Sequence, residues 1–229
     1  MPKYRYDLHI HSALSPCADD DMTPVNIVAT ASALGIDIIA IADHNAIRNV
    51  EAAMEVGEAL GVTVVPAFEL QTNEDLHLLC LFPDFNLLEE FHKKINFTSL
   101  KNREEIFGRQ LVINSDDEVV EIEPSMLLMA AEISECEAQA LAKRYMGVCV
   151  PAHIDRDSYG MLSVLGGVPD YYKAVEFSCD GKGEPQGLEE VLVIRDSDAH
   201  TLDSIGRGVH FLELDEPTPQ ALINFLNKQ

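Results

Sequence analysis

Residues 36–43, IDIIAIAD, decide the fold class of this 229-residue chain. The run is apolar except for Asp37 and Asp43, and it follows directly on Gly35. A short apolar run without polar alternation is typical of a strand that is buried on both faces, as the strands of parallel sheets are. We therefore expect residues 36–43 to form a doubly buried strand.

The segments on either side alternate between helix and strand patterns. Thr23 and Pro24 suit the N-cap and the first helical position of one helix, which ends at Gly35, and Gly61 ends a second helix. The expected elements, in order, are strand 4–10, helix 23–34, strand 36–43, helix 50–60 and strand 62–70. This alternation predicts an α/β fold with a parallel sheet or barrel.

The alternation is interrupted between residues 86 and 146. There we expect a helix, an isolated hairpin over 109–124, and then two helices, the second of which begins with a capping box formed by Ser134 and Glu137. Strand patterns return at 147–153, 174–179, 191–200 and 208–214, and a last helix covers 218–228. Because there are no repeats and no Pro/Gly/Ser-rich linker, the pattern predicts one domain over 1–229 that carries an insertion at 86–146.

The charge balance limits the partners that the chain can have. Lysine and arginine number 16 against 39 aspartates and glutamates, so the formal net charge is −23. A field of this sign repels polyanions, and we expect no duplex nucleic acid as the main partner. An anionic substrate is still compatible with the charge if bound cations invert it locally. Nothing in the composition indicates an oligomeric state.

The expected location is the cytoplasm. No run of about 18 apolar residues is present, so we expect no membrane partner, and the first residues lead into the expected strand without the pattern of a secretory leader. The five cysteines are irregularly spaced, as in a reduced protein without a disulfide framework. Cys17 lies close to the first histidines, and we interpret it as a small buried thiol rather than as a ligand.

Metal-ligand residue types recur at the strand ends. They are His9 and His11, Asp43 and His44, Glu69, His77, His153, and Asp198 with His200. The first strand should place Asp7, His9 and His11 on one face and Leu8 and Ile10 on the other, because strand side chains alternate. Loops and side chains converge at the carboxyl ends of parallel strands, where active sites of such folds lie.

This donor set indicates a polynuclear metal site. Imidazole and carboxylate ligands without a thiolate array suit Zn²⁺, Mn²⁺ or Fe²⁺, and a carboxylate such as Glu69 can bridge two ions. A single histidine at a strand end is usually only a hydrogen-bonded residue, but the repetition over several strands favours metal binding. His92 and His210 lack this context, and we interpret them as a solvated helix residue and a strand residue.

The motifs DLHIHS, IADHN, FEL, LHLL, PAH and DSDAH, in this order, resemble the polymerase-and-histidinol-phosphatase (PHP) family of metal-dependent phosphoesterases. The resemblance covers roughly residues 4–83 and 148–214. It implies a distorted (β/α)₇ barrel, similar to a TIM barrel, that holds two to three divalent metal ions.

The resemblance also implies how the ligands are divided among the ions. The first ion would be held by His9, His11, Glu69 and Asp198, and the second by Glu69, His77 and His153. The third would be held by His44, His200 and an acidic residue of the loop after the first strand. That loop, SPCADDDMTP, departs from the family pattern because it is longer and has no glycine. Counting back from Thr23 makes Asp19 the match, with Asp20 as the second choice.

The function that follows is phosphoester hydrolysis, with a hydroxide between the first two ions as the nucleophile. Asp198 or His200 would manage the proton of the leaving group. Arg207, and less strongly Arg156, are the candidates for contact with the substrate phosphate. The substrate would be a phosphorylated small molecule, a nucleotide or an oligonucleotide end. The basic residues between His92 and Arg109 could form a lid that contacts an extended anionic substrate such as a nucleotide chain, but a solvated helix face is the favoured interpretation.

Two other functions fit parts of the pattern. An amidohydrolase-like hydrolase of C–N bonds also uses paired histidines on a barrel, but no lysine stands at a strand end to form the carbamate that such enzymes often use. A non-catalytic barrel that binds a partner is the other alternative, and the presence of every ligand type argues against it.

Overall fold

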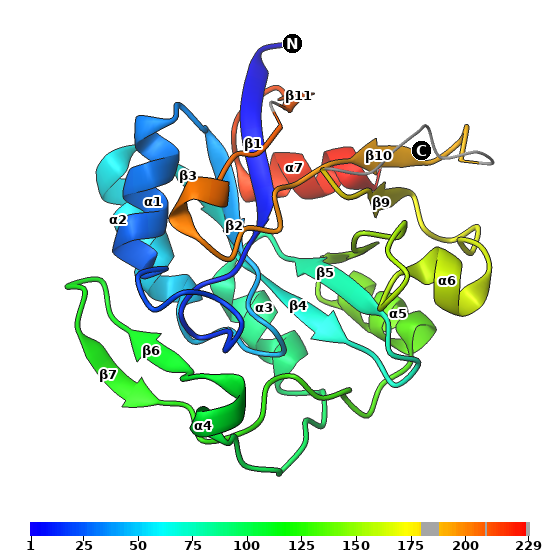
Figure 1. Ribbon diagram of the computed structural model, residues 1–229. Coiled ribbons are helices and arrows are strands. Elements are labelled where there is room, and N and C mark those ends of the chain that lie inside the picture. The colour runs from blue at the N-terminus through cyan, green and yellow to red at the C-terminus, as the bar shows by residue number, and fades with distance from the viewer. Residues whose placement is uncertain (180–187, 209, 228–229) are drawn as a thin grey trace.

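The strands lie in several small sheets in the computed structural model, which describes residues 1–179, 188–208 and 210–227 (Figure 1). The strands are β1 (Lys3–Ile10), β2 (Ile38–Ile41), β3 (Thr63–Val65), β4 (Ala67–Gln71), β5 (His77–Leu81), β6 (Leu111–Ile113), β7 (Val119–Ile122), β8 (Val148–Pro151), β9 (Ala174–Glu176), β10 (Leu192–Ile194) and β11 (Phe211–Glu213). The helices are α1 (Pro24–Ala33), α2 (Val50–Leu60), α3 (Phe85–His92), α4 (Glu104–Phe107), α5 (Glu135–Arg144), α6 (Met161–Leu165) and α7 (Pro219–Leu226), with a 3-10 turn at Leu202–Ser204. The fold is therefore mixed α/β.

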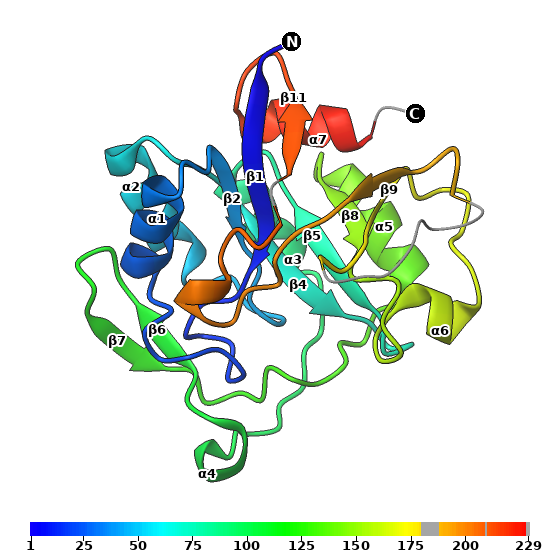
Figure 2. The same cartoon turned by 45° about the horizontal axis from the view of Figure 1, so that its top comes forward.

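The first sheet confirms the alternation that the sequence predicts over its first 65 residues. Its order is β11-β1-β2-β3, with β1, β2 and β3 parallel and β11 antiparallel at the edge. Thr23 caps α1 by accepting a hydrogen bond from the Asn26 backbone N–H at 3.2 Å, and α2 ends at Gly61, whose φ of 74° only glycine adopts without strain. Both helices lie side by side on one face of this sheet (Figures 1 and 2).

The expected strand over 62–70 is divided at Pro66. Proline cannot donate to a ladder, so β3 stays with the first sheet while β4 joins the antiparallel sheet β4-β5-β8. In the described residues β9 and β10 pair only with each other, in parallel. Within these residues the strand ladders are therefore not continuous, and they do not form the closed seven-stranded barrel that the resemblance implies.

Single backbone contacts join the sheets at the strand ends. His44 and Glu69 form an isolated parallel bridge between the ends of β2 and β4, and Ile10 and Ala199 form another after β10. The Ile154 N–H donates to the Glu176 carbonyl at 3.0 Å, which links the segment after β8 to β9. The carboxyl ends of the strands are thus brought together although the ladders between them are interrupted.

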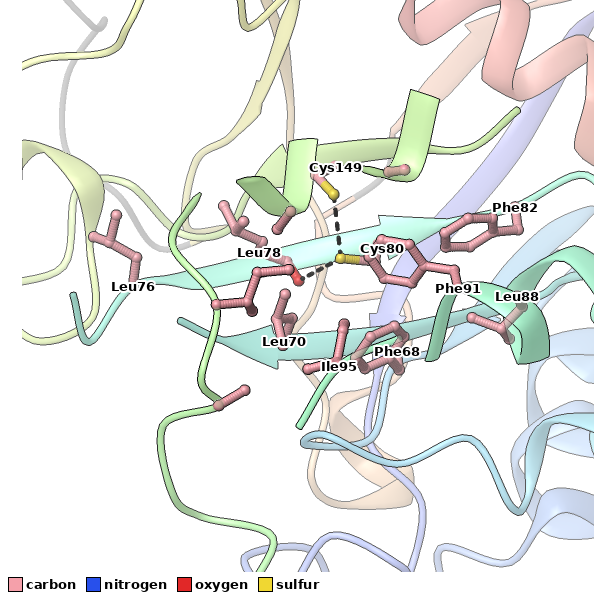
Figure 3. Close-up of a cluster of buried hydrophobic side chains, with 14 of the residues drawn as sticks. Phe68, Leu70, Leu76, Leu78, Cys80, Phe82, Leu88, Phe91, Ile95 and Cys149 are labelled. Carbon is pink, nitrogen blue, oxygen red and sulfur yellow. Dashed lines mark hydrogen bonds between the residues drawn. The ribbon is translucent and has the colours of Figure 1, made fainter. Parts of the chain in front are cut away.

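Two apolar clusters support this arrangement. One contains Leu8, Ala40, Leu79, Val150 and Ile194 from strands of three sheets, and buried side chains of α7 pack on it. The other lies between the β4-β5-β8 sheet and helices α3 and α5, and Figure 3 shows its phenylalanines beside the facing thiols of Cys80 and Cys149, whose sulfur atoms are 3.4 Å apart. Burial of these side chains provides the main driving force for folding.

The segment from α3 to α5 contains the predicted hairpin, β6 and β7, and the predicted capping box at Ser134. One helix, α5, follows the hairpin in place of the two that we expected. Asn49, before α2, donates to the Leu111 carbonyl at 3.0 Å and accepts from the Ile113 N–H at 2.9 Å, so the hairpin is fixed beside the strand ends. None of the helices in the described residues is long and apolar enough to cross a membrane.

Candidate metal centre

His9 lies in β1 and His11 directly follows it, at an irregular end of the strand. The register of β1 against β2 shifts between Asp7 and Ile10, so the strict alternation expected from the sequence is broken there. Leu8 and Ile10 consequently lie in different apolar clusters. Asp7 accepts hydrogen bonds from the backbone N–H groups of Ser197 (2.9 Å) and Gly206 (2.7 Å).

Glu69 lies at the centre of the candidate site. Its Oε1 is 2.8 Å from His77 Nδ1 and 3.1 Å from His153 Nε2, and its Oε2 is 2.8 Å from His44 Nδ1. His9 Nε2 lies 3.3 Å from Oε1. The carboxylate is therefore shared by imidazoles from four different segments of the chain.

Three overlapping groups of donor atoms surround this carboxylate. Within each group all ligand atoms lie within 4.8 Å of one another. The groups are His9, His11 and Asp198; His44, Glu69 and His77; and His11, Cys17, His44 and His200. In the first group His11 Nε2 is 3.1 Å from Asp198 Oδ1 and 3.2 Å from His9 Nε2.

The outer nitrogens of three histidines are already engaged. His9 Nδ1 lies 3.0 Å from Glu176 Oε1, His11 Nδ1 lies 3.0 Å from Ser15 Oγ, and His200 Nδ1 lies 2.8 Å from the Asp198 carbonyl. Hydrogen bonds of this kind fix the ring orientation of metal-ligating histidines and leave Nε2 as the ligand atom.

The inner donor atoms are better arranged for binding metal ions than for hydrogen bonding to one another. Glu69 Oε2 and His77 Nδ1 are buried and have no hydrogen bond of acceptable geometry, although each is 2.8 Å from a neighbouring donor atom. Buried polar atoms are normally satisfied, so unpaired donors at this spacing indicate ligands that converge on a cation. The donor set, imidazole and carboxylate, suits divalent transition metals.

The charges of the centre are strongly coupled. Burial raises the pKa of Glu69, but the imidazoles of His77, His9 and His44 hold it well below its ordinary value. Burial likewise opposes ionisation of His9, whose pKa is nevertheless raised well above its ordinary value by Glu176, Glu69 and Asp198. The pKa of Asp198 is lowered, against the effect of burial, by His9 and His11.

Strained backbone positions cluster at the site. His153 (φ 30°), Asp198 (φ 49°) and Asn45 (φ 50°) adopt positive φ angles that non-glycine residues rarely adopt. Asn45 is held by its side chain, which donates to the carbonyls of Leu127 and Met129, both at 2.8 Å. Such strain is characteristic of functional sites, where the surrounding structure enforces it.

A pocket of about 690 Å³ opens onto the donor atoms. It is lined by Cys17, His44, Glu69, Gln71, His77, Leu128, His153, Asp155, Arg156, Asp157, Ser158, Tyr159, Asp198 and His200. Arg156 Nη2 lies 2.6 Å from Asp198 Oδ2, and Tyr159 stacks on the His77 ring at 4.3 Å. Arg207 lines a neighbouring pocket of about 360 Å³ that shares Arg156 and Asp198 with the first. Of the two predicted arginines, Arg156 is therefore the one on the main pocket.

The family model for the PHP domain matches residues 7–155. The chain belongs to the PHP domain family. The resemblance noted in the sequence is thereby confirmed, and the match includes the donors from His9 to His153.

Two curated relatives match parts of this PHP domain. A 5′-3′ exoribonuclease of Haemophilus influenzae is 32% identical over 69 residues, which is 30% of this chain and 24% of the relative. A phosphoribosyl 1,2-cyclic phosphate 1,2-diphosphodiesterase of Eggerthella lenta is 32% identical over 80 residues, which is 33% of this chain and 29% of the relative. The matched segments thus span less than a third of these relatives.

Solved structures share the fold. The lesion-specific endonuclease PfuEndoQ of Pyrococcus furiosus has a TM-score of 0.71 at 17% identity, covering 99% of this chain and 56% of its own. An endonuclease Q in complex with a 27-mer duplex substrate has a TM-score of 0.68 at 16% identity, covering 97% and 56%. A metal-dependent phosphoesterase, described as putative, from Bifidobacterium adolescentis has a TM-score of 0.53 at 18% identity, covering 96% and 94%.

The acidic loop of this PHP domain does not place its aspartates at the donor atoms. Asp19 is exposed and belongs to none of the three groups; its backbone N–H donates to the His200 carbonyl at 2.9 Å. Asp20 pairs with Arg109. Cys17, which we interpreted as a small buried thiol, is instead exposed, and its sulfur lies among the donor atoms.

Several residues of the site were not identified from the sequence. Glu176 is buried at the end of β9 beside His9, and it also accepts the His153 N–H at 2.9 Å. Ser15 connects His11 with Asp43, to which its hydroxyl donates at 2.7 Å. A glutamate after an apolar run such as AVEF does mark Glu176 as a strand-end carboxylate, and that pattern is the one sign that could have identified it. His92, expected to be solvated, is half-buried and lies 3.0 Å from the Asn45 carbonyl.

Proposed function

We propose that this PHP domain hydrolyses phosphoester bonds with the help of two to three divalent metal ions, Zn²⁺, Mn²⁺ or Fe²⁺. The observation that carries the proposal is the convergence of donor groups on the buried Glu69 at the base of an open pocket. Family membership supports the same chemistry, because the relatives include an exoribonuclease and a diphosphodiesterase.

The ions would be held in the order that the family resemblance implies. His9, His11, Glu69 and Asp198 would hold the first, and Glu69 would share the second with His77 and His153. His44 and His200 would hold the third, together with a residue of the loop after β1. When bound, such ions supply a nucleophile from water near neutral pH and neutralise charge on phosphoryl oxygens.

The side chains around the ions would position the substrate. Arg156 reaches the pocket from the loop after β8 and is held by Asp198, so its remaining N–H groups can bind a phosphoryl oxygen. Arg207 lies beside it in the adjoining pocket and would bind a second phosphoryl oxygen or a neighbouring phosphate. When only the first two ions are bound, His200, whose side chain is 31% exposed at the mouth of the site, would be better placed than the more buried Asp198 to pass a proton to the leaving group.

The proposed substrate is a nucleotide, an oligonucleotide end or a small phosphorylated molecule. A mixed lining of one arginine, one stacked tyrosine and several polar groups suits a phosphate that is attached to a ring. The endonuclease Q complex contains a duplex, but this chain covers 56% of that protein, and its net charge of −23 opposes binding that is driven by the duplex backbone. We also propose that residues 1–229 form one domain, with 86–146 as an insertion.

The test uses the chelator-treated protein reloaded with Mn²⁺ or Zn²⁺. We expect release of nitrophenol from aryl phosphate mono- and diesters, and of phosphate or nucleotide from 5′-phosphorylated oligonucleotides. Glu69→Gln should abolish this activity, whereas Glu58→Gln, on the exposed face of α2, should retain it. A folded, metal-loaded protein that leaves all these esters intact would refute the proposal.

Hydrolysis of amides by the same preparation would instead favour the amidohydrolase alternative. The described residues that line the pocket include no lysine for a carbamate bridge.

A further inference from the structure

The loop between β1 and α1 places a thiol at the metal centre. The sulfur of Cys17 lies with the ligand atoms of His44 and His200 in one group whose members are all within 4.8 Å of one another. A tetrahedral zinc ion separates its sulfur and nitrogen ligands by about 3.6 Å, so these atoms would need to approach one another by at most about 1.2 Å to bind one ion. His44 is 8% exposed and His200 has Nδ1 engaged by the Asp198 carbonyl, which leaves its Nε2 for a ligand.

His11, the fourth member of the group, is already committed elsewhere. Its Nε2 lies 3.1 Å from Asp198 Oδ1 and 3.2 Å from His9 Nε2, so this nitrogen belongs to the first group of donors. Its Nδ1 lies beside Ser15 Oγ. Cys17, His44 and His200 therefore form a three-ligand set with room for a further ligand from solvent or substrate.

The loop is fixed so that the cysteine, and not an aspartate, faces the histidines. The Ser15 hydroxyl donates to Asp43 and lies 3.2 Å from the His44 N–H, which it accepts. Two residues after the cysteine, the Asp19 N–H donates to the His200 carbonyl, and the Asp19 side chain is exposed. Asp19 thus anchors the loop through its backbone N–H and not through its side chain.

The insertion supports the loop from outside. The Leu111 N–H of the hairpin donates to the Ala13 carbonyl at 2.8 Å. Gly108 lies so close to Pro16 that a Cβ atom there would be 2.6 Å from the Pro16 carbonyl oxygen. Arg109 pairs with Asp20. These contacts restrain the residues on both sides of Cys17.

We propose that Cys17, as a thiolate, binds the third metal ion together with His44 and His200, in place of the loop carboxylate that the family pattern implies. The proposal rests on the metal centre of the proposed function. One thiolate and two imidazoles form a set that zinc uses in catalytic sites with an open position, whereas Mn²⁺ prefers oxygen ligands. This site should consequently select Zn²⁺ or Co²⁺ over Mn²⁺, while the carboxylate-rich first site should discriminate less.

Cobalt substitution tests the sulfur bond directly. Metal-free protein is titrated with Co²⁺, and the near-ultraviolet charge-transfer absorption that a cobalt–thiolate bond produces is recorded beside the visible bands of all bound cobalt. We expect the charge-transfer absorption in the wild type, in Asp19→Asn and in Cys136→Ser, whose thiol is exposed on α5, and its loss in Cys17→Ser. Its absence from cobalt-loaded wild type, or its loss in Asp19→Asn but not in Cys17→Ser, would overturn the proposal.

A second measurement needs no variant and therefore does not depend on how Cys17→Ser folds. Cys17 and Cys136 are both exposed, so iodoacetamide should alkylate both in the presence of a chelator. Zn²⁺ should slow alkylation of Cys17 by at least about tenfold relative to Cys136, because a metal-bound thiolate is a poor nucleophile, and Mn²⁺ should not. Equal alkylation of the two cysteines with and without Zn²⁺ would overturn the proposal. Protein that binds cobalt and cleaves phosphoesters but shows no sulfur bond would refute this inference alone, whereas protein that binds no cobalt would also refute the metal centre.

Discussion

Glu176 allows a sharp test of how the protein holds its first metal ion. The residue is not a candidate ligand, but both of its oxygens lie near His9 Nδ1, at 3.0 and 3.1 Å, and one accepts the His153 N–H at 2.9 Å. The substitution Glu176→Gln keeps the shape of the side chain and removes its charge. In either orientation of the glutamine amide, its NH₂ group faces His9 Nδ1 or the His153 N–H, so at least one of these hydrogen bonds is lost.

The magnitude follows from what the carboxylate does in each state. Beside a protonated His9, two charges 3.0 Å apart would interact by about 5.5 kcal/mol at an effective dielectric constant of 20. A metal-bound imidazole is formally neutral, however, and the ion is farther away, so the loss in the bound state is smaller. Hydrogen-bond partners of metal-ligating histidines typically contribute 10- to 100-fold in affinity, or about 1.4–2.7 kcal/mol. We expect Glu176→Gln to weaken Zn²⁺ binding by that factor.

The loss should also depend on pH. Burial lowers the pKa of His9, but Glu176 is the strongest of the carboxylates that raise it well above its ordinary value. A proton therefore competes with the metal in the wild type, and it competes less in the variant. The difference in affinity between the two proteins should shrink as the pH falls from about 8 to about 6.

The assay is a competition titration with a chromophoric chelator, accompanied by thermal unfolding with and without metal. Glu213→Gln, at an exposed position of β11 that pairs with Lys3, is the matched control and should bind Zn²⁺ like the wild type. A folded Glu176→Gln protein whose affinity stays within about twofold at pH 8 would refute the assigned role.

Two further predictions concern the loop and the protons of the centre. In urea unfolding, Gly108→Ala should destabilise the protein by about 1–3 kcal/mol more than Gly166→Ala. Both glycines have a positive φ, but only a Cβ atom at position 108 would meet the Pro16 carbonyl oxygen. Equal losses of stability in the two variants would contradict this clash. Burial opposes protonation of His44, but Glu69 and Cys17 raise its pKa to about 10. In metal-free protein the protonated form of His44 therefore stabilises the fold. This contribution is fully present below about pH 6.5 and is lost as the pH rises through about 10. Metal binding near pH 7.5 should accordingly release protons, seen as a buffer-dependent heat in calorimetry, and the absence of any release would show that His44 is neutral beforehand.

The parts of the structure that the sequence predicts well are those that local chemistry determines. Thr23, Gly61 and Ser134 end or begin helices because their caps involve only residues within a few positions. The ligand types at the strand ends were predictable for a different reason. Because β5 runs antiparallel to both of its neighbours, the carboxyl ends of β4 and β8 lie at the same edge of their sheet, and Glu69 and His153 meet although 84 residues separate them.

The parts that could not be predicted depend on register and on loop shape. The register of β1 against β2 shifts between Asp7 and Ile10, and nothing in YDLHIHS marks where this irregularity lies. The choice of Cys17 over Asp19 depends on the hydrogen bond between the Asp19 N–H and the His200 carbonyl, which joins segments 181 residues apart. Counting positions against a family pattern cannot detect such a contact.

The residues that we propose as metal ligands lie where the sheets are joined. The ladders stop short of closing, and the isolated bridges that replace them are His44 with Glu69, and Ile10 with Ala199, which stands between Asp198 and His200. Ions bound by donors from β1, β4 and β5 and from the segments after β2, β8 and β10 would therefore cross-link sheets that the backbone connects only weakly. Metal binding and folding are then coupled, because the first and third ions would be held by donors from different sheets and would close the junctions between them. A chelator should for this reason do more than inactivate the protein. It should loosen the strand ends first, which amide exchange would show as lost protection at Asn45 and Ala199 before the interior of β5 is affected.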